Sequence, residues 1–154
     1  MMDAAEFKQR LLQTIHNRDN PYHPLVWING DPEIGSGTYI GGFSEINAKG
    51  ARVIIGRDCD IASFVAINVA DSHRRAIGLD DQISRREIIL GDCVFVGSHS
   101  AILGGAHIGH HTVVAAGVVV RAGIIPPFSL ILPNKIVHGY YRAEFEAKYG
   151  KQFD

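Results

Sequence analysis

The stretch that decides the fold runs from residue 89 to residue 120 and reads ILGDCVFVGSHSAILGGAHIGHHTVVAAGVVV. Within it an aliphatic residue returns at every sixth position: Leu90, Val96, Ile102, Ile108, Val114 and Val120. Glycine directly follows three of them, at Gly91, Gly97 and Gly109. A period of six is neither the 3.6 of an amphipathic helix nor the plain alternation of an isolated strand. A hexad that extends for a few residues and then bends makes one side of a coil.

The same period occurs earlier in the chain, at Ile34, Ile40 and Ile46 and then, after a slip, at Ile55, Ile61 and Ile67. Three hexads close a triangular coil, and stacked coils form a parallel β-helix with strands about 4.8 Å apart. We therefore predict an all-β solenoid of about five coils, with hexads grouped at 34–51, 55–72, 90–107 and 108–125 and a partial coil through 26–33. A sandwich or barrel would instead alternate in strands spaced about 8–12 residues apart.

The composition agrees with such a solenoid. The chain has 17 glycines and only 8% aromatic residues, which suits a narrow tube that turns a corner every six residues. The glycine after the aliphatic position is expected to relax the bend at each corner. The aliphatic first position is predicted to point inward. The fifth position is also predicted to face the interior, because it is usually small or β-branched: Thr38, Ser44, Gly50, Cys59, Val65, Val94, Ser100, Ala106, Thr112 and Val118.

The rest of the chain divides around these coils. Residues 1–20 are predicted to form an N-terminal helical cap on the open end, with a helix over 3–18 whose Asp3 and Glu6 are spaced like a capping box. The β-helix occupies 21–133, and Pro126 and Pro127 are expected to end the repeat. Residues 134–154 form a C-terminal extension, with a short helix or strap over 140–149.

One interruption of the repeat stands out. Ile67 and Leu90 are 23 positions apart instead of six, so seventeen extra residues leave the solenoid as an excursion loop at 73–89. Loops on a rigid scaffold are common sites of binding and catalysis. This loop is rich in charge: Arg74, Arg75, Asp80, Asp81, Arg85, Arg86 and Glu87.

Length and charge exclude several classes of protein. A chain of 154 residues fits one domain, and its net charge of −1 offers no basic surface for nucleic acid. No apolar run is long enough to span a membrane, and the N-terminal residues lack the features of a signal peptide. Two cysteines are too few for a disulfide scaffold, so a cytoplasmic location is expected.

The tandem hexads, the long loop with a histidine at its start and the Pro-Pro pair together resemble the hexapeptide-repeat acyltransferases over about residues 28–137. The likeness is greatest to the sugar O-acetyltransferase branch, with its galactoside and maltose acetyltransferases and polysaccharide-modifying relatives. This resemblance implies a left-handed parallel β-helix. It also implies a homotrimer whose acetyl-CoA and acceptor sites lie between subunits, and transfer of an acetyl group to a sugar, nucleotide sugar or polysaccharide precursor.

The resemblance places the catalytic base at His73. A sugar hydroxyl attacks a thioester only when a positioned base accepts its proton, and a neutral imidazole can do so near neutral pH. Asp71 could hold the other ring nitrogen, or it could satisfy the interior at the base of the loop. For acetyl-CoA the family positions correspond to Ser98 and Ala116, and Arg121 and Lys135 are candidates for its phosphates or ordinary surface residues.

The acceptor site departs from the family pattern. Gly42 and Gly50 stand near the positions of the acceptor-binding Asn and Asp of galactoside-type members. This chain instead offers Glu45 and Asn47, together with the loop arginines, for which Arg74 and Arg85 are the candidates. These arginines could meet an anionic acceptor such as a nucleotide sugar, or could simply be solvated.

Two other functions use the same solenoid. The γ-type carbonic anhydrases hold zinc with histidines, two of them five residues apart, but the cluster His99, His107, His110 and His111 lacks that spacing. No metal is therefore predicted. A non-catalytic scaffold is the other alternative, although it needs no long excursion. The sequence leaves O- versus N-acetylation open, and Cys59 and Cys93 are expected to pack rather than react.

Overall fold

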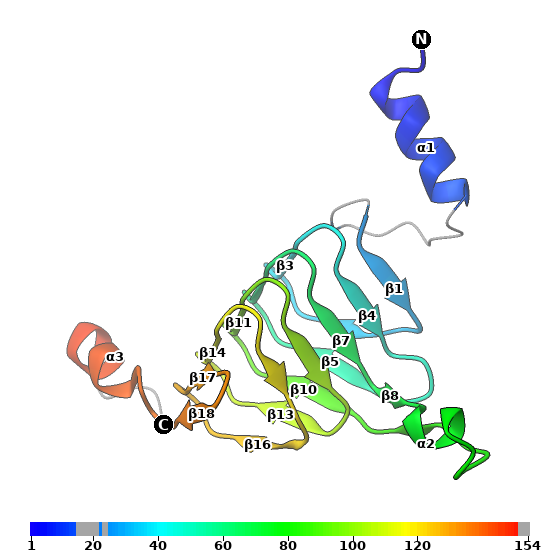
Figure 1. The fold of residues 1–154 in the computed structure, drawn as a ribbon. Helices are drawn as coiled ribbons and strands as arrows, with labels where there is room; N and C mark the ends of the chain where they lie inside the picture. The colour runs from blue at the N-terminus through cyan, green and yellow to red at the C-terminus, as the bar shows by residue number, and fades with distance from the viewer. Residues whose placement is uncertain (15–21, 23–24, 151–154) are drawn as a thin grey trace.

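The computed structural model describes residues 1–14, 22 and 25–150 of the chain. Over these residues the backbone winds through a stack of triangular coils, seen from the side in Figure 1. Each coil contributes one strand to each of three parallel sheets, which form the three faces of the stack. The predicted parallel β-solenoid of about five coils, with a helix near each end, is thereby confirmed. Its left-handedness stays an implication of the family resemblance.

The faces are named in the order in which a coil visits them. The first face stacks β1 (Trp27–Asn29), β4 (Glu45–Asn47), β7 (Ala66–Asn68), β12 (Ala101–Leu103) and β15 (Val119–Val120). The second face stacks β2 (Glu33–Ile34), β5 (Val53–Ile55), β10 (Ile88–Leu90), β13 (Ala106–Ile108) and β16 (Gly123–Ile125). The third face stacks β3 (Tyr39–Ile40), β6 (Asp60–Ile61), β11 (Phe95–Val96), β14 (Val113–Val114), β17 (Leu130–Leu132) and the antiparallel β18 (Lys135–Val137). The first, second and third corners are the bends that follow the faces of the same number.

The register between coils keeps equal hexad positions in line. On the first face Ile46 lies opposite Ile67, and Ile67 lies opposite Ile102. All three side chains are fully buried. The first hexad position therefore forms a continuous aliphatic column, and each such side chain contributes roughly 1.5–3 kcal/mol of hydrophobic stabilisation. The six-residue period of the sequence therefore matches the register in which the coils pair.

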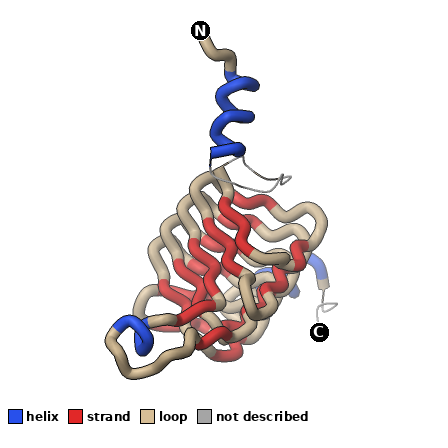
Figure 2. Tube along the Cα trace, turned by 90° about the vertical axis from the view of Figure 1, so that its right-hand side faces the viewer, coloured by secondary structure: helices blue, strands red, loops and turns tan. Residues whose placement is uncertain are grey.

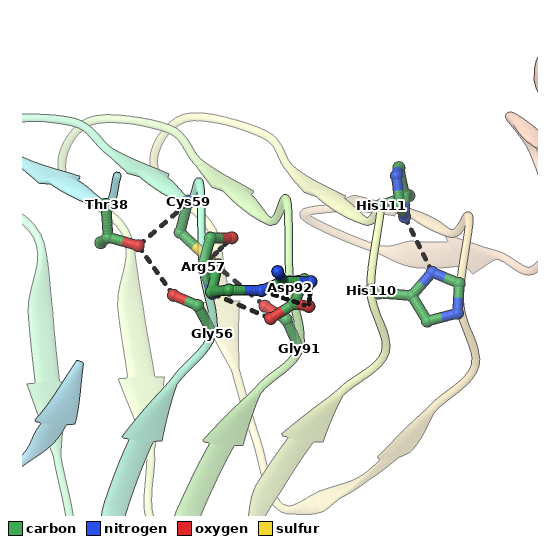
Figure 3. Close-up of polar contacts among 8 residues, drawn as sticks. All are labelled: Thr38, Gly56, Arg57, Cys59, Gly91, Asp92, His110 and His111. Atoms are coloured by element: carbon green, nitrogen blue, oxygen red, sulfur yellow. Dashed lines mark hydrogen bonds and ion pairs between the residues drawn. The ribbon is translucent and has the colours of Figure 1, made fainter. Parts of the chain in front are cut away.

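The fifth hexad position carries hydroxyl groups that connect neighbouring coils. The Thr38 hydroxyl donates to the Gly56 carbonyl at 2.7 Å and accepts from the Cys59 N–H at 3.1 Å, as Figure 3 shows. These bonds satisfy polar groups that would be costly to bury alone. The same arrangement recurs at Ser44, Ser100 and Thr112. Gly50 is an exception to the predicted inward pattern, because it lies exposed at the first corner.

Glycine follows the aliphatic position because two coils nearly touch there. A Cβ on Gly97 would lie 2.4 Å from the backbone nitrogen of Ala116, and one on Gly109 would lie 2.4 Å from that of Pro127. Neither glycine has a left-handed backbone, so close approach rather than corner flexibility requires it. This corrects the expectation that these glycines relax the bends. Left-handed conformations occur at other corner positions. Some of these are glycines, such as Gly37 and Gly117. Seven non-glycine residues of the second and third corners are also left-handed: Phe43, Asp58, Phe64, Cys93, His99, His111 and Phe128.

The Pro-Pro pair does not end the repeat. Pro126 takes the corner position that Gly109 holds one coil earlier, where the Gly109 N–H donates to the Ile125 carbonyl at 2.8 Å. Because β16 is the last strand of the second face, no further coil offers a carbonyl to this position. The missing N–H of proline therefore costs nothing. The chain continues into β17 and returns as β18, so the third face gains two more strands.

The N-terminal helix α1 (Ala4–Thr14) has the predicted cap, since the Glu6 N–H donates to Asp3 Oδ1 at 2.7 Å. The rest of the predicted helix, residues 15–18, lies outside the described residues. Figure 1 shows α1 extending away from the first coil, and the Phe7 side chain is 55% exposed. The covering of the open end by residues 1–20 stays a prediction.

The C-terminal helix α3 (Arg142–Tyr149) packs against the second corner of the last coils. The ring of Phe128 is fully buried and stacks on His111 with their centroids 5.3 Å apart. From α3, Phe145 meets His111 edge-on at 4.8 Å, and the Arg142 guanidinium lies 4.9 Å above the Phe128 ring. This cluster attaches the predicted C-terminal helix to the solenoid.

The packing of His111 in this cluster leads us to predict that the protein loses stability in acid. Burial lowers the pKa of His111 and the neighbouring His110 lowers it further, while Asp92 opposes the shift. Because the folded state binds this proton less readily than the unfolded chain, stability is complete above about pH 6.5 and is lost as pH falls through the folded pKa. We expect the melting temperature to fall between about pH 7.5 and pH 5.5 and His111→Phe to reduce that fall. An equal fall in both proteins would contradict this.

Because Gly97 and Gly117 have different surroundings, we expect their substitution by alanine to lower the free energy of unfolding by different amounts. Gly97→Ala forces a Cβ against the backbone of the next coil and should lower the free energy of unfolding by about 3 kcal/mol. Gly117→Ala is the control, because Gly117 has φ +71° and open space around its Cα. It should cost about 1 kcal/mol for the left-handed backbone alone. Denaturant unfolding at one protein concentration measures both, and equal losses would exclude the close-approach explanation.

Candidate active site

The excursion loop leaves the solenoid at the first corner, after β7, and projects from the stack in Figure 2. Its base is an antiparallel pair, β8 (Ala70–Asp71) with β9 (Ser84–Arg85), and it carries the single-turn helix α2 (His73–Ala76). The solenoid resumes at Ile88, which is fully buried. The excursion thus spans 70–87 rather than the expected 73–89, because Ile88 already faces inward two positions before Leu90.

His73 and Asp71 form a hydrogen-bonded pair at the start of this loop. The His73 Nδ1 atom lies 2.5 Å from Asp71 Oδ1, which also accepts the His73 backbone N–H at 3.1 Å. The side-chain bond, followed by the backbone bond, lowers the pKa of Asp71. An ionised carboxylate can only accept, so Nδ1 carries the proton of this bond, and in a neutral imidazole this leaves Nε2 as the acceptor. Asp71 is half exposed and does not serve the interior.

Three hollows are connected by shared lining residues: two lie at the first corner, and the third lies over β15 to β18 at the C-terminal end of the stack. The His73 hollow, of about 140 Å³, contains Asp71, His73 and Ser84. The central hollow, of about 370 Å³, shares Asp71 and Ser84 with it. The terminal hollow, of about 390 Å³, shares Arg121 with the central hollow and extends to Lys135. Shared walls make these three hollows one groove that runs from His73 past Arg121 to Lys135.

The predicted acetyl-CoA residues fall in two separate regions, the groove and the third corner. Arg121 and Lys135 lie in the groove, together with the His73 pair. Ser98 and Ala116 are stacked in adjacent coils at the third corner, where the Gly117 N–H donates to the Ser98 carbonyl at 2.9 Å. The first face separates that corner from the groove. Within one chain, the structure therefore brings only half of this set to His73.

Glu45 and Asn47 lie on the outward side of β4, away from the three hollows. The Asn47 amide donates to Asn68 Oδ1 at 3.1 Å, and its oxygen accepts the Lys49 N–H at 3.1 Å. These bonds tie two coils together at the first corner. The structure thus gives Asn47 a connecting role and places neither residue in the groove of its own chain.

The loop arginines differ from one another in position. Arg74 lines the His73 hollow, with its Nε atom 3.9 Å from Asp80 Oδ2. Arg85 lies over Gly50, where a Cβ would come within 2.6 Å of Arg85 Cδ, and lines none of the three hollows. Its neighbour Arg86 lines the central hollow. Successive residues of an extended segment point to opposite sides, so Arg86 rather than Arg85 lines the central hollow. The acceptor-binding role of Arg85 stays a prediction.

Ser84 also lines the groove, although the sequence did not predict it. The pairing of β8 with β9 sets Asp71 opposite Ser84, so that both residues line the His73 hollow and the central hollow. That pairing joins residues thirteen apart in an irregular loop, where no hexad marks the register.

Each remaining histidine of the predicted cluster has a local partner. His99 stacks on Phe64 at 4.9 Å, and the His107 Nε2 atom lies 3.4 Å from Glu87 Oε1. His110 and His111 share a hydrogen bond at 2.8 Å between their Nδ1 atoms (Figure 3). In the part of the chain that the structure describes, no three His, Cys, Asp or Glu side chains are grouped to hold a metal ion.

The two cysteines are unpaired by disulfide, and they differ in burial. Cys59 is buried in the core, as expected, and burial raises the pKa of its thiol. Cys93 is exposed at the second corner. Among the described helices none is long and apolar enough to cross a membrane.

Comparison with known proteins places this geometry in context. No family model matches the chain. The carnitine operon protein CaiE of Escherichia coli K12 is 29% identical over 105 residues, which make up 66% of this chain and 54% of CaiE. The chain thus spans about half the length of the curated relatives it matches.

Three solved structures share the fold. The polySia-specific acetyltransferase NeuO has a TM-score of 0.57 and 24% identity, over 74% of this chain and 61% of NeuO. The hexapeptide-repeat acetyltransferase VCA0836 of Vibrio cholerae has a TM-score of 0.59 and 24% identity, over 90% and 81%. The N-acyltransferase AntD of Bacillus cereus, in complex with dTDP and 3-hydroxybutyryl-CoA, has a TM-score of 0.63 and 18% identity, over 81% and 72%.

The chain has the fold of the hexapeptide-repeat acyltransferases. The resemblance seen in the hexads is thus confirmed by the arrangement of the coils. At identities of 18–24%, the likeness establishes the hexapeptide-repeat fold. The reaction that this chain catalyses depends on the residues of its groove.

Proposed function

We propose that the protein is an acetyl-CoA-dependent acetyltransferase whose acceptor is a hydroxyl or amine of a sugar, nucleotide sugar or polysaccharide precursor. The observation that carries this proposal is the His73–Asp71 pair, which opens into a groove ending at two cations. A base, its orienting carboxylate and a cationic channel are what transfer from a phosphorylated thioester donor needs. Proteins of the same fold carry out acyl transfer.

The mechanism is direct transfer in a ternary complex. His73 Nε2 accepts the acceptor proton as the oxygen or nitrogen attacks the thioester carbonyl, and Asp71 holds Nδ1–H and stabilises the imidazolium. Collapse of the tetrahedral intermediate breaks the C–S bond, and the proton passes from His73 to the departing thiolate. Backbone N–H groups near the carbonyl would stabilise the oxyanion.

The donor is proposed to bind between subunits of a homotrimer. Arg121 and Lys135, at the far end of the groove, would meet its phosphates. Ser98 and Ala116 would contact it from the third corner of a neighbouring chain, because the first face separates that corner from the groove of their own chain. A cytoplasmic location remains a prediction from the cysteine content.

His73→Ala tests the proposed base. Turnover should fall about 10²- to 10⁴-fold, because general base catalysis contributes that much, while acetyl-CoA binding stays unchanged. Asp71→Asn should lower turnover less, with the same donor affinity, since it leaves the imidazole in place. Thiol release with a panel of sugars measures turnover, and calorimetry measures acetyl-CoA binding. Wild-type protein that neither releases thiol nor binds acetyl-CoA would rule out the transferase.

Arg121→Gln and Lys135→Gln test the donor end of the groove. Each removes one positive charge from the terminal hollow, so each should raise the KM for acetyl-CoA with little change in kcat. Lys49→Gln is the matched control, because Lys49 is exposed and lies outside the groove. If the control raises the KM as much, the effect is one of overall charge and the assignment is wrong.

A further inference from the structure

Arg86 is held in place by backbone on both sides. Its N–H donates to the Val69 carbonyl at 3.1 Å, and the next residue's carbonyl, that of Glu87, accepts the Gly105 N–H at 2.9 Å. These bonds attach this end of the excursion to two different coils. The Arg86 side chain is therefore presented from a rigid part of the loop rather than from its tip.

The guanidinium of Arg86 lies against a glycine. A Cβ on Gly105 would be 3.4 Å from both Arg86 Cζ and Arg86 Nη1, and 2.8 Å from the Ala122 Cβ. Because Gly105, with φ +94°, has no side chain, the Arg86 guanidinium lies directly beside the place that a Cβ would take. A Cβ in this position would therefore touch the guanidinium and would clash with Ala122. The head group of Arg86 is thereby directed along the wall of the central hollow.

The central hollow has an excess of positive charge. It contains Arg86 and Arg121, and its one acid is Asp71. The Asp71 carboxylate already accepts two hydrogen bonds from His73. Over the described residues, no carboxylate oxygen lies within 4.0 Å of the nitrogens of either arginine. The charge of Arg86 helps to lower the pKa of Asp71, after the larger effects of the His73 hydrogen bonds, but the two side chains form no direct ion pair. A planar guanidinium with no carboxylate in contact, in a hollow of about 370 Å³, suits a bidentate anion.

The hollow is adjacent to the proposed base. Asp71 and Ser84, which face each other across β8 and β9, line both the His73 hollow and the central hollow. An acceptor whose reacting group lies at His73 therefore reaches the Arg86 hollow across this single pair. The donor phosphates, by contrast, are proposed to lie in the terminal hollow, in which Arg86 takes no part.

We infer that Arg86 selects acceptor sugars that carry a negative charge, a carboxylate or a phosphate, close to the group that is acetylated. This inference rests on the proposed transferase function and adds the chemical class of the acceptor. The anion would bind the guanidinium side-on in the central hollow, and its sugar would extend over Asp71 and Ser84 to His73.

The test compares matched acceptors that differ only in charge: methyl glucuronide with methyl glucoside, and glucose 6-phosphate with glucose. Wild-type protein should prefer the charged member of at least one pair by tenfold or more in kcat/KM. Arg86→Gln should lower that preference about 10- to 100-fold, or about 1.4–2.8 kcal/mol, with the KM for acetyl-CoA unchanged. Arg86→Lys should retain part of it, since it keeps the charge without the planar fork.

Arg57→Gln is the control, because Arg57 forms an exposed ion pair with Asp92 at the second corner. It should leave the preference intact. Calorimetric titration with methyl glucuronide and glucose 6-phosphate provides a readout that needs no turnover, and thermal unfolding confirms that each variant is folded.

The outcomes separate this inference from the proposed function. Transfer that ignores the charge of the acceptor overturns the inference and leaves the transferase standing. A rise in the KM for acetyl-CoA in Arg86→Gln, with acceptor preference unchanged, also overturns it, because the anion is then the donor phosphate. If no charged probe is acetylated and none binds to wild-type protein more tightly than to Arg86→Gln, the inference is likewise wrong.

Discussion

Adjacent coils of this protein are held one β-ladder apart, and at corner positions such as Gly97 and Gly109 this spacing leaves no room for a Cβ. Gly97 and Gly109 are each followed by backbone of the next coil at a distance that a methyl group would violate. Because the coils are this close, equal hexad positions stack into inner columns such as Ile46, Ile67 and Ile102. The core, the register and the buried hydroxyl bridges all depend on that spacing.

The excursion is compatible with this spacing because it closes upon itself. The pairing of β8 with β9 brings its two ends together, and β10 returns to the second face in register, with Ile54 opposite Ile89. The ladder constrains the faces, whereas the first corner tolerates both a short bend and an eighteen-residue insertion. The loop can therefore carry polar and charged groups without disturbing the core, and backbone hydrogen bonds fix its base to the coils.

That attachment to the coils explains how the groove is organised. Asp71, Ser84 and Arg86 all belong to the base of the loop, where backbone bonds fix them, while Arg74 belongs to its outer part. The proposed base His73, its orienting carboxylate Asp71 and the guanidinium inferred to bind an anion are thereby placed along one corner of the solenoid. The third corner, with Ser98 and Ala116, faces elsewhere. In the proposed trimer, a neighbouring chain supplies what the corner at His73 lacks.

The sequence by itself determined the solenoid, the break after the second full coil and the Asp71–His73 pair, because each is a local pattern. A hexad sets inward and outward positions within a few residues, and a two-residue spacing lets Asp71 reach the ring of His73. Only the tertiary structure decided that Arg86, and not Arg85, lines the groove, since that choice depends on bonds to Val69 and Gly105 in other coils. It also decided the roles of Pro126 and of the corner glycines. The corner glycines are required by the neighbouring coil, and Pro126 is tolerated because no neighbouring strand follows β16 on the second face. A local sequence pattern does not reveal contacts with residues about eighteen positions away.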